Sequence, residues 1–148
     1  MGKDKLKRFA AIKSFDNVFE PVMGETFAQK GNWRKSVFGN DNPIILELGC
    51  GKGEYAVGMG RQFPDRNFIG VDLKGNRIYI GAKEALETNL SNVAFLRTRI
   101  DFILDYFAEG EIDEDWLTFS DPQPQKALKR LSSPIFTARY QKILKPGS

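Results

Sequence analysis

The chain has 148 residues, of which 41% are hydrophobic and 12% aromatic, so it is long enough for one folded domain with a substantial core. Its single cysteine, Cys50, excludes a disulfide framework and indicates a reducing compartment, and no apolar run approaches the ~20 residues that cross a bilayer. The net charge of +3 is divided into +4 over residues 1–35, −7 over residues 36–122 and +6 over residues 123–148.

These properties favour a cytoplasmic protein, since the N-terminus also lacks the apolar stretch of a secretory signal. Two basic ends around an acidic middle fit an anionic macromolecule that is held from both flanks. Lysines that only keep the termini soluble would produce the same distribution. Charge alone therefore leaves both interpretations open.

The first 42 residues are predicted to form an irregular, basic and aromatic segment in front of a domain at residues 43–148. From residue 43 onward, short apolar runs alternate with amphipathic stretches of helical period. Four β-α units in succession predict an α/β fold with a parallel, doubly wound, Rossmann-like sheet. In chain order we expect strands at 44–48, 67–72, 93–96 and 116–119, and helices at 53–63, 78–86, 100–107 and 133–144.

A glycine cluster follows the first of these strands. Gly49, Gly51 and Gly53 form a G-x-G-x-G turn between the strand and the helix, which differs from the dinucleotide fingerprint G-x-G-x-x-G. Glycine allows the backbone to turn sharply there and allows a ligand to lie against it. A tight βα turn without a ligand would need the same residues.

Two carboxylates make the ligand interpretation more specific. Asp72 ends the second strand, where a carboxylate can accept hydrogen bonds from both ribose hydroxyls of a nucleoside. Glu47 precedes the glycine turn, where it would attract an ammonium group and repel a pyrophosphate. The pair favours S-adenosylmethionine over NAD, although Asp72 could instead cap the next helix. A purely structural role for Glu47 is disfavoured because an unpaired carboxylate in a parallel strand is costly.

With these residues in place, the chain resembles the bacterial tRNA (guanine-N7)-methyltransferases, a family of class I S-adenosylmethionine-dependent enzymes. The resemblance extends over the whole chain. Many methyltransferases share the two strand motifs, whereas the Ser-Asp-Pro-x-Pro segment with basic residues behind it is specific to this family. The matching segments are 46–53, 67–74, Asn92-Val93, 119–126, 129–131, Tyr140 and 144–147.

The resemblance implies methyl transfer to N7 of a variable-loop guanosine in tRNA. It implies that Glu47, Asp72 and Asp121 contact the cofactor and that Asp121 is also the catalytic carboxylate. Arg99 occupies the cofactor position where the family usually has Asp or Asn. The position of the family's substrate-binding lysine holds Gln125, and Lys126 follows it as a candidate replacement.

The chemistry expected of Asp121 is electrostatic. Guanine N7 carries an in-plane lone pair and no proton, so it can attack the sulfonium methyl group without a general base. The site must align the reacting atoms and exclude water, and a carboxylate beside the purine can stabilise the charge that passes to it. Without the resemblance, Asp121 before a proline would be interpreted as a turn initiator.

The N-terminal segment also suits RNA, because lysines neutralise phosphates and aromatic rings can stack on bases. We expect Lys5, Lys7 and Arg8 to contact phosphates and the phenylalanines to pack against the sheet.

No metal site is expected. The family fold has seven strands, so the sequence predicts a domain truncated after its fourth β-α unit. Two alternatives to tRNA methylation stay open: a methyltransferase that acts on another methyl acceptor, and an inactive RNA-binding protein. A monomer and a homodimer are both compatible with the sequence.

Overall fold

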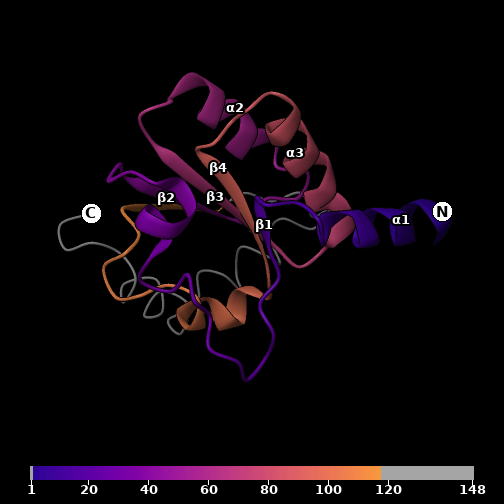
Figure 1. The fold of residues 1–148 in the computed structure, drawn as a ribbon, viewed down its shortest axis with the longest axis horizontal. Coiled ribbons are helices and arrows are strands. Elements are labelled where there is room, and N and C mark those ends of the chain that lie inside the picture. Colours follow the sequence, from indigo (N-terminus) through magenta and orange to yellow (C-terminus); the bar gives the residue numbers. More distant parts are fainter. Residues whose placement is uncertain (1, 118–148) are drawn as a thin grey trace.

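A computed structural model describes residues 2–117 of the chain. Within this range five parallel strands form one sheet in the order β1-β4-β3-β2-β5 (Figure 1). The elements are α1 (Gly2–Ile12), β1 (Val18–Phe19), the π-helix η1 (Trp33–Phe38), β2 (Ile44–Leu48), α2 (Glu54–Gln62), β3 (Asn67–Asp72), α3 (Gly75–Glu87), β4 (Val93–Arg97), the 3-10 helix η2 (Ile100–Asp105) and β5 (Glu114–Leu117).

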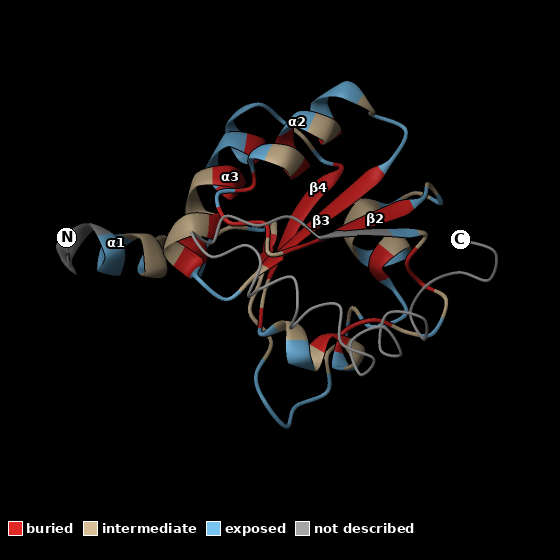
Figure 2. Cartoon of the chain, turned by 180° about the vertical axis from the view of Figure 1, so that it is seen from behind, coloured by how far each residue is buried: buried red, intermediate tan, exposed pale blue. Residues whose placement is uncertain are grey.

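The central strands are buried on both faces, as expected for parallel strands with continuous apolar runs (Figure 2). Along β2, Ile45 belongs to the core cluster that contains residues of α1, α2 and α3. Its neighbours Ile44 and Leu46 belong to the second cluster, which contains residues of η1 and η2. Helical segments thus cover both faces, and the predicted α/β, doubly wound architecture is confirmed.

The prediction that residues 1–42 are irregular was wrong. They contain α1, β1 and η1, and β1 adds a strand to the sheet by pairing with β4. Ile12 at the end of α1 is 1% exposed, and Trp33 at the start of η1 is fully buried. β1 has only two residues and forms by pairing with β4, so no local pattern reveals it. The 11-residue α1 is stabilised by its packing against the start of α3.

The predicted helix at 100–107 forms as the shorter 3-10 helix η2. Ile100, Ile103 and Tyr106 all pack in the cluster under the sheet, and their spacing of three suits three residues per turn. The last predicted strand starts two residues early, at Glu114. The helix expected at 133–144 lies outside the described residues. Within residues 2–117, no helix is long and apolar enough to span a membrane.

Candidate functional site

The glycine turn lies at the carboxyl ends of β2 and β3. Gly49, Gly51 and Gly53 all adopt positive φ angles, of 74°, 56° and 73°. The N–H groups of Gly49 and Cys50 both donate to the carbonyl oxygen of Val71, at 2.8 and 2.9 Å, and so tie the turn to β3. The turn therefore has a fixed shape that needs glycine, because other L-residues rarely adopt this backbone conformation.

Close packing adds a second requirement for glycine at position 53. A Cβ atom on Gly53 would lie 2.6 Å from Cε1 of Phe95, and one on Gly81 would lie 2.5 Å from the carbonyl oxygen of Lys52. Gly53 is also the N-cap of α2, so the turn, α2 and α3 meet at this point. A side chain here would push the turn away from α3.

Asp72 lies beside the turn, as its place at the end of β3 predicted. The N–H of Gly51 donates to its Oδ2 at 2.8 Å, and the N–H of Lys74 donates to its Oδ1 at 3.0 Å. Lys74 is the N-cap residue of α3, so Asp72 also binds the backbone at the start of the next helix, as the alternative capping role required. A carboxylate offers about four acceptor positions, and two bonds leave Asp72 able to accept more.

Glu47 makes the neighbourhood of the turn strongly negative. It is 4% exposed within β2, where it pairs in register with Gly70 of β3. Burial, followed by the charges of Asp72 and Glu47, raises the pKa of the Cys50 thiol well above its usual value. The thiol therefore stays protonated at neutral pH and serves as a buried packing group, with its Sγ 3.0 Å from where a Cβ on Gly70 would lie.

Two residues of this edge were missed by the sequence analysis. Tyr55, in the first turn of α2, has its pKa raised by burial and by the charges of Glu47 and Glu114, so its phenol remains a hydrogen-bond donor. Leu73, directly after Asp72, is 51% exposed and presents an apolar surface. Neither residue stands out by spacing, and only the position next to a motif residue could have suggested them.

The residues that follow β4 include Arg99. Arg99, predicted to occupy a cofactor position, is the N-cap residue of η2, and its exposed side chain forms an ion pair with Asp101 at 3.8 Å. Nearer the sheet, the Thr98 N–H donates to the Asp72 carbonyl oxygen at 3.1 Å. The Arg97 guanidinium turns toward the N-terminal segment, where it meets Glu20.

The predicted substrate residues fall into two groups. Lys5 and Lys7 are exposed on α1, and Arg8 on the same helix is half-buried. Asp121, Gln125 and Lys126 lie outside the described residues. Within the part of the chain that the structure describes, no three acidic, cysteine or histidine side chains gather as a metal site would require.

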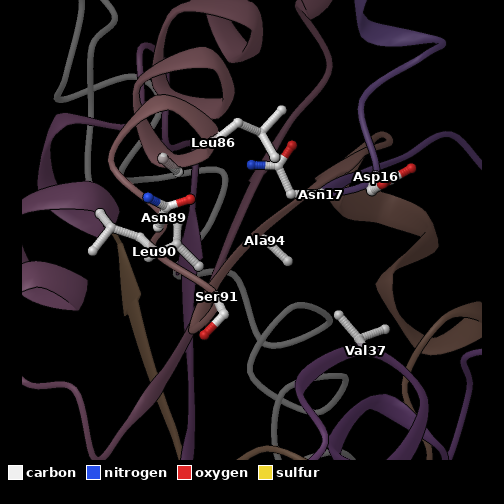
Figure 3. A pocket seen from close by; sticks show the side chains of 10 residues that line it. Asp16, Asn17, Val37, Leu86, Asn89, Leu90, Ser91 and Ala94 are labelled. Carbon is white, nitrogen blue, oxygen red and sulfur yellow. The ribbon is translucent and has the colours of Figure 1, made fainter.

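A separate cavity of about 320 Å³ lies at the opposite, amino-terminal edge of the sheet (Figure 3). The cavity is lined by the end of α3, the start of β4 and the residues before β1. Its polar side chains include Asp16, Asn17, Asn89 and Ser91. None of the glycine-turn residues line it, so it is not part of the site around Asp72.

The expected packing of the aromatic residues is confirmed. Phe15 stacks on Tyr79 with a centroid separation of 5.7 Å, and Phe19 meets Trp33 edge to face at 5.2 Å. Asn92 has a structural role, because its Nδ2 lies 2.9–3.2 Å from the carbonyl oxygens of Gly60, Phe63 and Arg66, and its two hydrogens join the start of β4 to the end of α2 and the turn after it.

Comparisons with known proteins show that the chain is similar to methyltransferases. A family model described as a putative methyltransferase matches residues 41–148. The tRNA (guanine-N(7)-)-methyltransferase of Bacteroides thetaiotaomicron is 57% identical over 99% of this chain and 60% of that protein. The enzyme of the same name from Cytophaga hutchinsonii is 40% identical over 99% of this chain and 67% of that protein. The chain thus spans about 60% of the length of the first of these relatives.

Solved structures share the fold at low identity. The 16S rRNA methyltransferase KamB superposes with a TM-score of 0.63 and 18% identity, over 89% of this chain and 60% of that one. A 16S rRNA (adenine(1408)-N(1))-methyltransferase from Catenulisporales acidiphilia, with cosubstrate SAM, gives a TM-score of 0.64 and 18% identity, over 80% and 58%. From the family model and the relatives together, the chain belongs to the family of tRNA (guanine-N(7)-)-methyltransferases.

Proposed function

We propose that the chain binds S-adenosylmethionine across the carboxyl ends of β2 and β3. The observation that carries this proposal is the Asp72 carboxylate, which accepts the Gly51 N–H at 2.8 Å and so lies directly beside the glycine turn. In this proposal Asp72 accepts the ribose hydroxyls, Glu47 attracts the ammonium group, and Gly49, Gly51 and Gly53 let the ligand approach the backbone.

The donor set fits this cofactor better than a dinucleotide. Two carboxylates, Glu47 and Asp72, flank a turn whose Gly51 N–H is already bonded to one of them. A pyrophosphate would need free N–H groups and positive charge, as at a helix N-terminus with a G-x-G-x-x-G loop. A ligand with an ammonium and a sulfonium group is attracted by the same carboxylates.

We further propose that this part of the enzyme serves methyl transfer to N7 of a guanosine in the variable loop of tRNA, in the cytoplasm. When bound, the cofactor supplies an electrophilic methyl group. The residues of the chain hold the reactants in line and keep water away from them. Support comes from relatives at 40–57% identity that are named for this reaction.

We also propose roles for residues near the substrate. Asp121 is proposed as the carboxylate beside the purine, and Arg99 as a neighbour of the adenine end of the cofactor. Gln125 or Lys126, together with the basic residues of α1, is proposed to hold the RNA. For Arg99 the support is its position just beyond Thr98, whose N–H is bonded to the Asp72 carbonyl oxygen.

The proposal is tested by two measurements. Calorimetry with S-adenosylmethionine should detect binding to the chain. A chimera in which residues 1–148 replace the matching 60% of the Bacteroides thetaiotaomicron relative should methylate unmodified tRNA from labelled cofactor, and borohydride and aniline should then cleave the tRNA at the variable loop.

Each outcome separates the alternatives. Cofactor binding together with label transfer to another acceptor, but not to tRNA, would indicate a methyltransferase with a different substrate. Binding of tRNA without any label transfer by the folded chimera would indicate an RNA-binding protein without activity. Absence of cofactor binding by the folded chain would contradict the proposed site.

A further inference from the structure

The exposed surface of α1 and α3 gathers positive charge from two distant parts of the sequence. α1 contributes Lys5, Lys7 and Arg8, and α3 contributes Lys83, with Lys74 as its N-cap residue. Four of these side chains are exposed, and Arg8 is half-buried. We call these five residues the basic ridge.

Tight packing brings the two helices together. A Cβ on Gly75 at the start of α3 would lie 2.8 Å from Cε1 of Phe9 and 2.9 Å from Cδ1 of Ile12, both on α1. Only glycine lets α1 come this close to the start of α3. Figure 1 shows α1 beside α3, with its N-terminal end pointing away from the sheet.

One aromatic ring joins the charges of the two helices. The Arg8 guanidinium lies 5.6 Å from the centroid of the Tyr79 ring, and the Lys83 ammonium lies 5.7 Å from the same centroid. A cation from each helix thus lies at the same ring, where α1 and α3 meet. The arrangement thus concentrates positive potential instead of dispersing it over the surface.

The side chains that the structure describes neutralise little of this charge. Among residues whose side chains the structure describes, Lys5, Lys7, Arg8 and Lys74 form no ion pair. Lys83 meets Glu87 at 4.0 Å, an exposed pair of small energetic value. The charge of the ridge is therefore available to a partner.

The ridge begins next to the candidate cofactor site. Lys74 is two residues from Asp72, and its N–H donates to the Asp72 carboxylate. From there the ridge continues onto α1, whose 11 residues make a helix about 16 Å long. A polyanion that lies along the ridge would pass close to the edge where methyl transfer is proposed.

We propose that the basic ridge is a phosphate-binding surface for the RNA substrate, with α1 and α3 contacting the same stretch of backbone. This inference rests on the proposed function and extends it, because it adds Lys74 and Lys83 and requires α1 to be docked on α3. The exposed Leu6 between two lysines would also suit an anionic membrane surface. The position of the ridge beside Asp72 favours RNA.

The test uses charge-neutral variants and unmodified tRNA in the absence of cofactor. K5Q/K7Q removes two charges from α1, and K74Q/K83Q removes two from α3. The matched control K30Q/K35Q removes two exposed lysines near η1, which packs against the start of β5 at the far edge of the sheet. Glutamine keeps helix propensity close to that of lysine, so each fold should be retained, as thermal unfolding would verify.

Fluorescence anisotropy should show tRNA binding weakened about fivefold per lost lysine at 0.15 M salt, because each phosphate contact releases a counterion. The slope of log K against log salt concentration should fall by about 0.7–0.9 per lysine in both ridge variants. The control should match the unchanged chain in affinity and slope.

Three results would overturn the inference: ridge variants that bind tRNA like the control, loss confined to the α1 variant, or no tRNA binding by the unchanged chain. Loss of binding to phosphatidylserine vesicles with unchanged tRNA affinity would assign the ridge to membranes instead. Calorimetry with S-adenosylmethionine on the same samples distinguishes failure of the ridge inference from failure of the proposed function, because the ridge does not include Glu47 or Asp72.

Discussion

Two regions of the molecule are held in place by different means. In the glycine-loop region, residues 44–72, the parts are joined by backbone hydrogen bonds, such as those from Gly49 and Cys50 to Val71. In the N-terminal region, residues 2–38, side chains make most of the attachments. The Trp33 Nε1–H donates to the Tyr106 carbonyl oxygen at 2.9 Å, and Arg97 forms an ion pair with Glu20 at 2.9 Å.

This difference shows how each region can be disrupted. The glycine-loop region depends on the absence of a side chain at a few positions, so an added methyl group should damage it. The N-terminal region depends on a few large or charged side chains, so removing one of them should loosen it while the cofactor edge stays intact. Four predictions test this contrast.

The largest effect is expected for Trp33→Ala. Trp33 is fully buried, stacks on Phe107 at 5.2 Å and donates a hydrogen bond to Tyr106. Its loss should lower the free energy of unfolding by about 3–5 kcal/mol, measured by urea denaturation. Val22→Ala, at a residue 59% exposed in the same region, should change it by less than about 0.5 kcal/mol. Equal effects of the two substitutions would refute the role assigned to Trp33.

Gly53→Ala should be the most damaging change in the glycine-loop region. A methyl group there would lie 2.6 Å from Phe95 at a φ of 73°, so we expect a loss of about 2–4 kcal/mol in stability, together with weaker cofactor binding. Gly58→Ala on the next helix meets no atom within 4 Å and should stabilise the chain by about 0.5–1 kcal/mol. A Gly53→Ala chain as stable as Gly58→Ala would show that the turn tolerates a side chain.

Asp72→Ala should weaken S-adenosylmethionine binding by about 1.5–3 kcal/mol, the range for hydrogen bonds to a charged group. The substitution also removes the acceptor of the Gly51 and Lys74 N–H groups, so part of the effect comes from the turn itself. Asp72→Asn, which keeps one oxygen acceptor, should lose less. Calorimetry that shows unchanged affinity, with an unchanged circular dichroism spectrum, would contradict the assignment of Asp72.

Arg97→Gln is expected to have the smallest effect, and a local one. Besides Glu20, Arg97 contacts the carbonyl oxygen of Leu73 at 3.0 Å and lies 4.7 Å from the centroid of the Phe9 ring. Its loss should cost about 1 kcal/mol and speed amide hydrogen exchange in α1 more than in α2.

Arg61→Gln is the matched control for Arg97→Gln. Its side chain is half exposed in a 3.6 Å pair with Glu84, and the substitution should leave exchange in α1 unchanged. Equal exchange rates in α1 of the two variants would show that Arg97 does not anchor that helix.

Residues 44–97 could be predicted from the sequence in almost every element. The apolar runs of β2, β3 and β4 are continuous because both faces are buried, and each ends close to where the pattern ends. The turn glycines and Asp72 could also be identified from the local sequence, because a strand, a sharp turn and a helix must follow one another directly.

The tertiary structure alone decided the N-terminal region and the side chains around the turn. β1 has only two residues and forms because β4 offers a free edge, and the 11-residue α1 docks on α3 because Gly75 admits Phe9. The position of Tyr55 near Glu114, and the ion pair of Arg97 with Glu20, depend on how distant segments meet. Spacing along the chain specifies the backbone of a βα unit, whereas long-range packing determines which side chains share its edge.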